Sequence, residues 1–199
     1  MKSKATRKLT AAAVIGALYA VLTVVLEPIS YGPVQFRISE VLCILPFFFP
    51  NAAWGLTVGC LIANLFGPNG LLDILFGSLA TLLAALCTAK IGIKARAAAG
   101  IGEIPAGTVL NGGAATDRKN IGYSPCILAC LMPVLFNAGI VGAELAWLSV
   151  SRELFWSTFA LYAAEVGGGE AAVLFVLGLP AMRYLMKDNK LAAILRELR

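Results

Sequence analysis

The sequence predicts an all-α membrane protein with six transmembrane helices. Hydrophobic residues make up 59% of the 199-residue chain and charged residues 14%, whereas ordinary soluble domains contain about 25% charged residues. The mean hydropathy is +0.84. A soluble fold of this size cannot bury so much apolar surface. Apolar runs separated by turn residues suit a helical bundle in a bilayer.

The apolar runs define the expected helices in order. They cover residues 9–26, 38–49, 52–66, 71–91, 123–148 and 154–186. Breaks that contain proline, at residues 27–28, 50–51 and 67–70, end the first three runs. A longer polar loop, residues 92–122, separates the fourth run from the fifth, and a short turn at 149–153 precedes the sixth. We therefore expect one six-helix domain, residues 1–199, whose second and third helices are short.

The basic residues predict the orientation of this bundle. If both ends of the chain lie in the cytoplasm, only Arg37 and Arg152 of the 16 Lys and Arg residues fall outside. Cytoplasmic loops are enriched in Lys and Arg, so the sequence predicts an N-in, C-in arrangement with six spans. We expect the first apolar run to be retained as a span, because no small-residue cleavage site precedes Glu27-Pro28.

Several classes of function are excluded or disfavoured by residue content. The chain contains no histidine, which removes histidine-based acid–base catalysis and Ser-His-Asp triads. It also lacks the phosphate-binding motif GxxxxGK[ST]. The five cysteines lie in apolar runs, where a free thiol behaves as a small hydrophobic group. We therefore expect no enzyme activity, no metal and no cofactor.

Polar side chains near the outer ends of the expected helices form a candidate substrate site. Ionisable groups within spans are costly and mark functional sites by default. The candidate residues are Gln35, Arg37, Glu40, Asn64, Asp73, Asn137, Glu144, Trp147, Tyr162 and Glu165. Structural alternatives exist for some: Arg37 with Glu40 as an interfacial ion pair, Asp73 as an acid at a helix start, and Trp147 in an interfacial aromatic belt.

The chemistry of these groups suits a flat heterocycle. Asn137 and Glu144 are seven residues apart, which puts them on one helical face. Carboxylates, an amide and aromatic rings together favour a ligand rich in N–H donors, because a guanine-like edge offers adjacent N–H groups to one carboxylate. We expect Glu144 to accept hydrogen bonds from that edge. We expect residues 29–37, a polar segment between two spans, to act as a lid.

Small residues on the first helix form a second candidate surface. Ala12, Gly16 and Ala20 are spaced by four, with Ala13 and Ala17 beside them. Such stripes allow close helix packing in lipid. They indicate either a docking surface for another membrane protein or packing inside this chain.

Three stretches resemble the QueT transporter family. They are ISYGPVQFRISE at residues 29–40, LDILFGSLATLL at 72–83 and PVLFNAGIVGAEL at 133–145. The resemblance implies the bundle of a substrate-binding S-component of an energy-coupling factor (ECF) transporter. Such a protein would capture queuosine precursors, which are 7-deazaguanine derivatives, from outside a prokaryotic plasma membrane. It would dock on a transmembrane T-component that carries two cytoplasmic ATPases.

The resemblance also implies roles for particular residues. The ligand contacts carried over from the matching stretches are Gln35, Arg37, Glu40, Asp73, Asn137 and Glu144. The family's docking motif, alanines four apart on the first helix, matches Ala13 with Ala17, or Ala12 with Gly16. Residues 102–120 form a longer loop than the family leads us to expect.

A second hypothesis is an autonomous secondary transporter of a small nitrogenous heterocycle. Glu165, Glu170 and the three glycines between them, residues 167–169, favour it, because such transporters use broken helices and ion relays near the membrane midplane. Which precursor binds, the cyano form, the aminomethyl form or queuine, stays open at this point.

Overall fold

The N-terminal apolar run forms α1 (Lys4–Val25), and the chain then turns through the short α2 (Glu27–Ser30). Pro28 lies in the first turn of α2. Proline is tolerated there because N–H groups in the first turn of a helix make no hydrogen bond within the helix. The computed structural model describes residues 4–31, 34–68, 70–101, 121–149 and 152–187. Within these ranges every regular element is a helix.

Two short helices follow, and they join through a turn at residues 48–51. The first, η1 (Ile38–Phe47), is a 3₁₀-helix, and the second is α3 (Ala52–Asn64). Residues three apart eclipse one another in a 3₁₀-helix, so Glu40, Cys43 and Pro46 share one face, which is buried. Each helix is about 20 Å long at the standard rise, which is less than the roughly 30 Å thickness of the hydrocarbon core.

Longer helices complete the bundle. They are α4 (Leu71–Ala98); α5 (Tyr123–Phe136), which runs through η2 (Asn137–Val141) into α6 (Gly142–Ser149); and η3 (Arg152–Leu154), α7 (Phe155–Val173), η4 (Leu174–Gly178) and α8 (Leu179–Lys187). Both η2 and η4 are π-helical turns. Helix α4 continues seven residues past the expected end at 91, because the alanine-rich residues 95–99 favour helix even where hydropathy falls.

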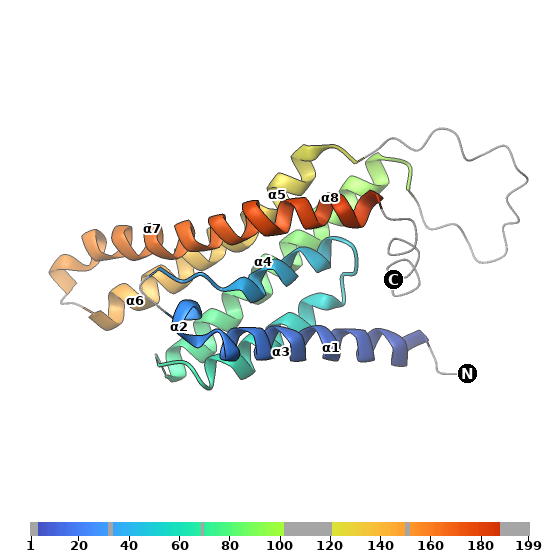
Figure 1. Cartoon of the computed structure of the whole chain (residues 1–199). Helices are drawn as coiled ribbons and strands as arrows, with labels where there is room; N and C mark the ends of the chain where they lie inside the picture. The colour runs from blue at the N-terminus through green and yellow to red at the C-terminus, as the bar shows by residue number, and fades with distance from the viewer. Residues whose placement is uncertain (1–3, 32–33, 69, 102–120, 150–151, 188–199) are drawn as a thin grey trace, which may run out of the picture.

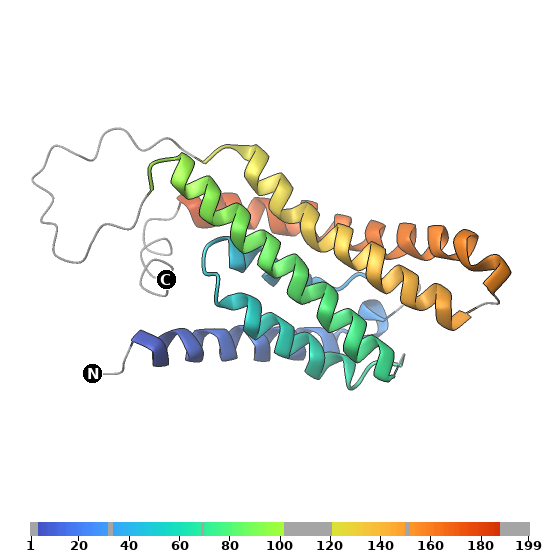
Figure 2. The same ribbon diagram turned by 180° about the vertical axis from the view of Figure 1, so that it is seen from behind.

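Four helical stretches are long and apolar enough to cross a membrane, by length and composition. They are Ala5–Val25, Leu71–Ala98, Tyr123–Ser149 and Arg152–Lys187, whereas Ile38–Phe47 and Ala52–Asn64 are shorter apolar helices. The six apolar stretches run alternately up and down the bundle (Figures 1 and 2). Helix α1 begins and α8 ends at one end, called the terminal end here, and α2 lies toward the opposite end, the α2 end (Figure 1).

Helices α1 and α3 approach each other closely. A Cβ atom added to Gly55 would overlap the carbonyl of Ala12, and one added to Gly59 would overlap the carbonyl of Gly16. Ala12, Gly16 and Ala20 are accordingly buried. This part of the small-residue stripe packs inside the protein, against the pair Gly55 and Gly59, which itself has the GxxxG spacing of close helix contacts in lipid.

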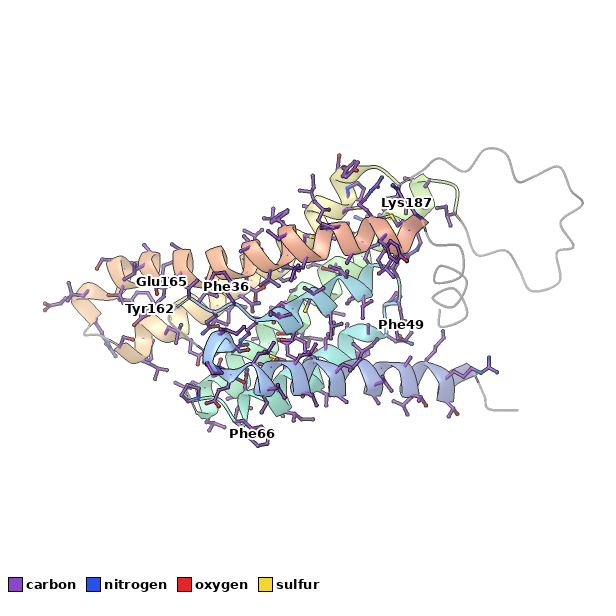
Figure 3. All side chains as sticks on the ribbon, in the orientation of Figure 1. Phe36, Phe49, Phe66, Tyr162, Glu165 and Lys187 are labelled. Carbon is purple, nitrogen blue, oxygen red and sulfur yellow. The ribbon has the colours of Figure 1, made fainter. Side chains whose placement is uncertain are left out.

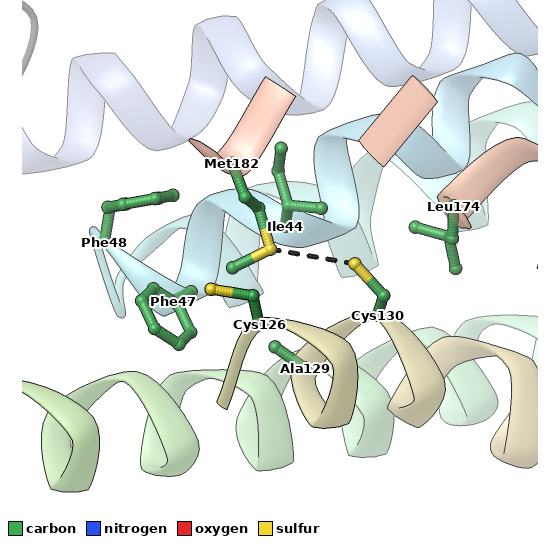
Figure 4. Packing of buried hydrophobic residues seen from close by; sticks show 8 residues of the cluster. All are labelled: Ile44, Phe47, Phe48, Cys126, Ala129, Cys130, Leu174 and Met182. Carbon is green, nitrogen blue, oxygen red and sulfur yellow. Dashed lines mark hydrogen bonds between the residues drawn. The ribbon is translucent and has the colours of Figure 1, made fainter. Parts of the chain in front are cut away.

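An apolar cluster closes the bundle toward the terminal end (Figure 4). It consists of Ile44, Phe47, Phe48, Cys126, Ala129, Cys130, Leu174 and Met182. The Cys130 Sγ lies 3.7 Å from the Met182 Sδ, and all five cysteines of the chain are free. The thiols fill space here as small apolar groups.

Candidate functional site

Toward the α2 end, the same bundle encloses polar and charged side chains from the segment before η1 and from η1, α3, α4, η2, α6 and α7. This buried polar cluster consists of Gln35, Arg37, Glu40, Asn64, Asp73, Asn137, Glu144 and Glu170. Each of these residues is at most 5% exposed. Burial of so many charged groups is unfavourable unless they are paired or hydrogen-bonded, so their partners decide what the cluster does.

Arg37 is the cation around which the cluster is arranged. Its Nη2 lies 3.7 Å from the Asp73 Oδ2, and its Nε donates a hydrogen bond of 3.4 Å to the Ser30 carbonyl. The guanidinium carbon lies 5.1 Å from the centre of the Tyr31 ring, within the range of a cation–π contact. Arg37 therefore connects the segment before η1 with the start of α4.

Glu40 already has partners for both carboxylate oxygens. The Tyr19 hydroxyl donates to one oxygen, and the Cys43 thiol lies 2.9 Å from the other. One residue earlier, the Ser39 hydroxyl lies 2.6 Å from the Thr23 hydroxyl of α1. Glu40 thus fixes η1 against α1, and its oxygens are occupied by these contacts.

Asn137 and Glu170 form a hydrogen-bonded pair between η2 and α7. The Asn137 Nδ2 donates to the Glu170 Oε1 at 2.6 Å. Asn137 is the first residue of the π-helical turn η2, and such turns widen a helix and often occur at functional sites. Glu170 lies next to Gly169, where the backbone of Gln35 passes so close that a Cβ atom would overlap it.

Several further polar atoms of the cluster have no hydrogen-bond partner in the described part of the chain. They include both carboxylate oxygens of Glu144, both of Asp73, the Glu170 Oε2 and the Arg37 Nη2. Buried polar atoms are normally hydrogen-bonded, so the carboxylate oxygens among them suit a ligand that carries several N–H donors.

Asn64 and Gly77 support this arrangement. The Asn64 Nδ2 donates to the Asp73 carbonyl at 2.8 Å, which holds the start of α4 against the end of α3. A Cβ atom on Gly77 would lie 2.6 Å from the Asn64 Nδ2 and 2.9 Å from the Asp73 Oδ1. Glycine is therefore required at this point for the two polar side chains to fit.

Three predicted site residues lie outside the cluster. Trp147 is 61% exposed, and Arg152 lies 5.7 Å from its ring centre. The Tyr162 hydroxyl lies 3.0 Å from that of Ser149, and Glu165 is half-buried on α7; Figure 3 labels Tyr162 and Glu165. Helix α6 and the first turns of α7 extend past α1, α3 and α4 (Figures 1 and 2), so side chains there have few neighbours to bury them.

The candidate set lacked Glu170, a member of the cluster, and Tyr19, whose hydroxyl donates to Glu40. Glu170 is paired with a residue 33 positions earlier, and spacing along the sequence cannot identify such a pair. Tyr19 and Thr23 do carry a signal, since they are polar residues four apart in an apolar run and so share a helical face. In the described residues, no group of three or more His, Cys, Asp and Glu side chains could hold a metal ion.

The small-residue stripe on α1 divides between two faces. Ala12, Gly16 and Ala20 face α3, whereas Ala13 and Ala17 are exposed. Docking on a partner through Ala13 and Ala17 stays a prediction. The expected lid, residues 29–37, is described except for residues 32–33, and the loop at 102–120 lies outside the described residues.

Comparison with known proteins assigns the chain to a family. The sequence profile described as "QueT transporter" matches residues 9–187. The protein named "Queuosine precursor transporter QueT" from Lactococcus lactis subsp. cremoris is 39% identical over 85 residues, which are 42% of this chain and 50% of that protein. The chain thus matches half the length of that relative, and no solved structure matches. Because the profile covers most of the chain and every residue of the buried polar cluster, this membrane protein belongs to the QueT transporter family.

Proposed function

We propose that this chain is the substrate-binding subunit of a transporter for a queuosine precursor, a 7-deazaguanine derivative. The observation that carries the proposal is the set of unpartnered carboxylate oxygens in the buried polar cluster, above all the two of Glu144. A guanine-like edge presents two adjacent N–H groups, which match the two oxygens of one carboxylate. The name of the Lactococcus relative supports this class of substrate.

The proposed subunit crosses the plasma membrane of a prokaryote six times, with both termini in the cytoplasm. The up-and-down order of the helices is compatible with six crossings (Figure 1). The α2 end then faces outward, so that the ligand enters the buried polar cluster from outside. The apolar cluster around Phe47 and Met182 closes the path on the cytoplasmic side.

Uptake is driven by ATP that partner subunits hydrolyse, as the resemblance to ECF S-components implies. The chain itself then acts as a binding protein and not as an enzyme. The exposed residues Ala13 and Ala17 on α1 are the proposed contact with the T-component, because small residues four apart allow two helices to approach closely in lipid.

Ligand binding to the purified full chain tests the substrate class. Isothermal titration with 7-cyano-7-deazaguanine, 7-aminomethyl-7-deazaguanine, queuine and guanine should give the tightest binding for a 7-deazaguanine. If none of the three deazaguanines binds, the proposed substrate class is wrong.

Assembly tests the coupling. The double variant Ala13→Leu with Ala17→Leu should lose co-purification with the T-component and ATPases and lose ATP-driven uptake, while ligand binding stays nearly intact. Val21→Leu is the matched control, because Val21 is also exposed on α1. Uptake into liposomes by this chain alone, without ATPases, would instead support the autonomous secondary transporter.

A further inference from the structure

We propose that Glu170 selects a ligand with a protonated amine, so that the preferred substrate is a cationic heterocycle and not a neutral one. This inference rests on the proposed function, because it concerns the same buried polar cluster. It assigns the two ends of the ligand to two different carboxylates.

Two of the four carboxyl groups in the cluster already have partners inside the protein, and the other two can contact a ligand. The cluster holds four carboxylates, those of Glu40, Asp73, Glu144 and Glu170. Glu40 is occupied by Tyr19 and Cys43, and the charge of Asp73 is balanced by Arg37 at 3.7 Å. Glu144 and Glu170 remain as carboxyl groups with unpartnered oxygens.

Glu144 and Glu170 differ in the number of carboxylate oxygens that lack a hydrogen-bond partner. Both oxygens of Glu144 are unpartnered, whereas Glu170 has only its Oε2 left, because its Oε1 accepts a hydrogen bond from Asn137 at 2.6 Å. Two free oxygens suit the paired N–H groups of a ring edge. One free oxygen on a fixed carboxylate suits a single-point contact, and a compact ammonium group makes such contacts.

Charge explains why the group at Glu170 should be cationic. Among the described members of the cluster, Arg37 is the one basic residue beside four carboxyl groups, and its ion pair is with Asp73. A buried carboxylate without a counter-charge is strongly unfavourable. An ammonium group on the ligand supplies that charge at Glu170, whereas a neutral ligand of the same shape does not.

The placement of the two carboxylates matches one extended ligand. Glu144 lies seven residues beyond Asn137, the partner of Glu170, which is about 10 Å along a helix. Glu144 lies on α6 and Glu170 on α7, and these two helices pack against each other. A fused two-ring base with a short arm has a comparable length, with its ring edge at Glu144 and its amine at Glu170.

The test compares two ligands that differ in charge but share the ring. Isothermal titration of the detergent-purified full chain should give at least tenfold tighter binding for 7-aminomethyl-7-deazaguanine than for 7-cyano-7-deazaguanine. Glu170→Gln should weaken binding of the aminomethyl compound about tenfold or more and change binding of the cyano compound less than about twofold. Glu170→Asp, which keeps the charge, should retain the preference for the amine. Glu153→Gln, an exposed position, is the matched control.

Two outcomes separate this inference from the proposed function. Equal affinity of the unmodified chain for the two compounds, or an equal loss of both in Glu170→Gln, overturns the selection by Glu170 and leaves the substrate class standing. Binding of neither compound overturns the substrate class, and the inference falls with it. Retained selectivity in Asn137→Ala would limit Asn137 to a structural role, and would overturn the part of the inference that depends on a fixed Glu170.

Discussion

A single side chain, Arg37, holds the charges of the candidate site together. It pairs with Asp73 on α4, donates to the carbonyl of Ser30 and lies over the ring of Tyr31. Because Arg37 is only 3% exposed and Asp73 is fully buried, neither charge can turn to water if its partner is removed. Their coupling should therefore be large, unlike that of a surface ion pair.

Loss of Arg37 alone should destabilise the protein more than loss of the pair. We expect Arg37→Gln to cost about 3–5 kcal/mol of unfolding free energy, because Asp73 is left buried without a counter-charge. The double variant Arg37→Gln with Asp73→Asn should recover part of that loss. Unfolding of the single and double variants in detergent measures the coupling, and strictly additive effects would show that the two charges do not interact.

Glu144 should affect every ligand that contains the guanine-like ring. We expect Glu144→Gln to weaken binding of the aminomethyl compound, the cyano compound and guanine alike, by about tenfold or more, since a charge-assisted hydrogen bond is lost. Titration calorimetry against the three ligands measures this, with Glu153→Gln as the control. Unchanged affinity for all three would remove Glu144 from the site.

Seven of the ten candidate site residues lie together in the buried polar cluster, and whether they bind a ligand stays a prediction. Arg37, Glu40, Asn64 and Asp73 lie beside chain breaks that are visible in the sequence, and a common orientation of the helices brings those breaks together. Trp147, Tyr162 and Glu165 could not be placed this way, because their burial depends on how far α6 and α7 extend past the other helices. How far α6 and α7 project beyond the other helices depends on how the helices pack together, and no single apolar stretch of the sequence determines it.

At the scale of the element, the segment between α1 and η1 is attached through Tyr31. Its hydroxyl donates to the carbonyl of Ala63 on α3 at 2.7 Å, and its ring lies close to Gly67. Burial raises the pKa of Tyr31 from 10.0 to about 12. The hydroxyl therefore stays protonated, and able to donate, throughout the physiological pH range.

This raised pKa predicts a loss of stability in alkali. The folded state keeps a proton that the unfolded chain releases above its pKa of 10.0, so stability falls as the pH rises through the window between the two values. Tyr31→Phe should show a weaker fall in melting temperature between about pH 9 and about pH 12, with Tyr184→Phe, an exposed tyrosine, as the control. An identical pH profile in Tyr31→Phe would contradict this assignment.

Close packing of α1 on α3 depends on glycine at the contact. Gly55→Ala should destabilise the protein by about 1–3 kcal/mol, because its Cβ atom would overlap the backbone of Ala12 and two helices would have to separate. Gly168→Ala is the control, since no atom lies within 4 Å of its added Cβ. Melting temperatures of both variants decide the point, and equal values would show that α1 can move away from α3 at no cost.

The same contact explains a limit of prediction from sequence. The stripe of small residues on the first helix indicated close packing, but its partner could not be chosen between α3 and another protein. Gly55 and Gly59 on the third helix have the same four-residue spacing of small residues. That spacing alone does not show whether the two helices pack on each other or on different partners. Similarly, the π-helical turn at Asn137–Val141 has no marker in hydropathy, because it changes local geometry without changing composition.

At the scale of the whole molecule, the bundle has two chemically different parts. Apolar residues and thiols fill the part toward the terminal end, and charged residues gather toward the α2 end. By contrast, the basic residues Arg7, Lys90, Lys94, Arg183 and Lys187 lie on segments at the terminal end. The positive-inside rule then predicts that the terminal end is cytoplasmic.

The two short helices make the number of crossings a question for experiment. Helices η1 and α3 are each about 20 Å long, so they either cross a locally thin bilayer or enter and return from one side. If both cross, the turn between them, which contains Asn51, lies in the cytoplasm with the start of α1 and the end of α8. Hydrophobic mismatch of this kind is tolerated at modest cost, because the bilayer thins or flanking residues adapt.

Single cysteines can settle both the orientation and the crossings. In a Cys87→Ala background, where the four remaining native cysteines are buried, we expect Glu153→Cys to react with a membrane-impermeant maleimide in intact cells. Arg7→Cys, Asn51→Cys and Lys187→Cys should react only after the cells are opened. The reverse pattern would invert the orientation that the basic residues predict. Labelling of Asn51→Cys together with Glu153→Cys, and of neither terminal position, would mean that η1 and α3 form a re-entrant pair, because the other four stretches alone still place both termini inside.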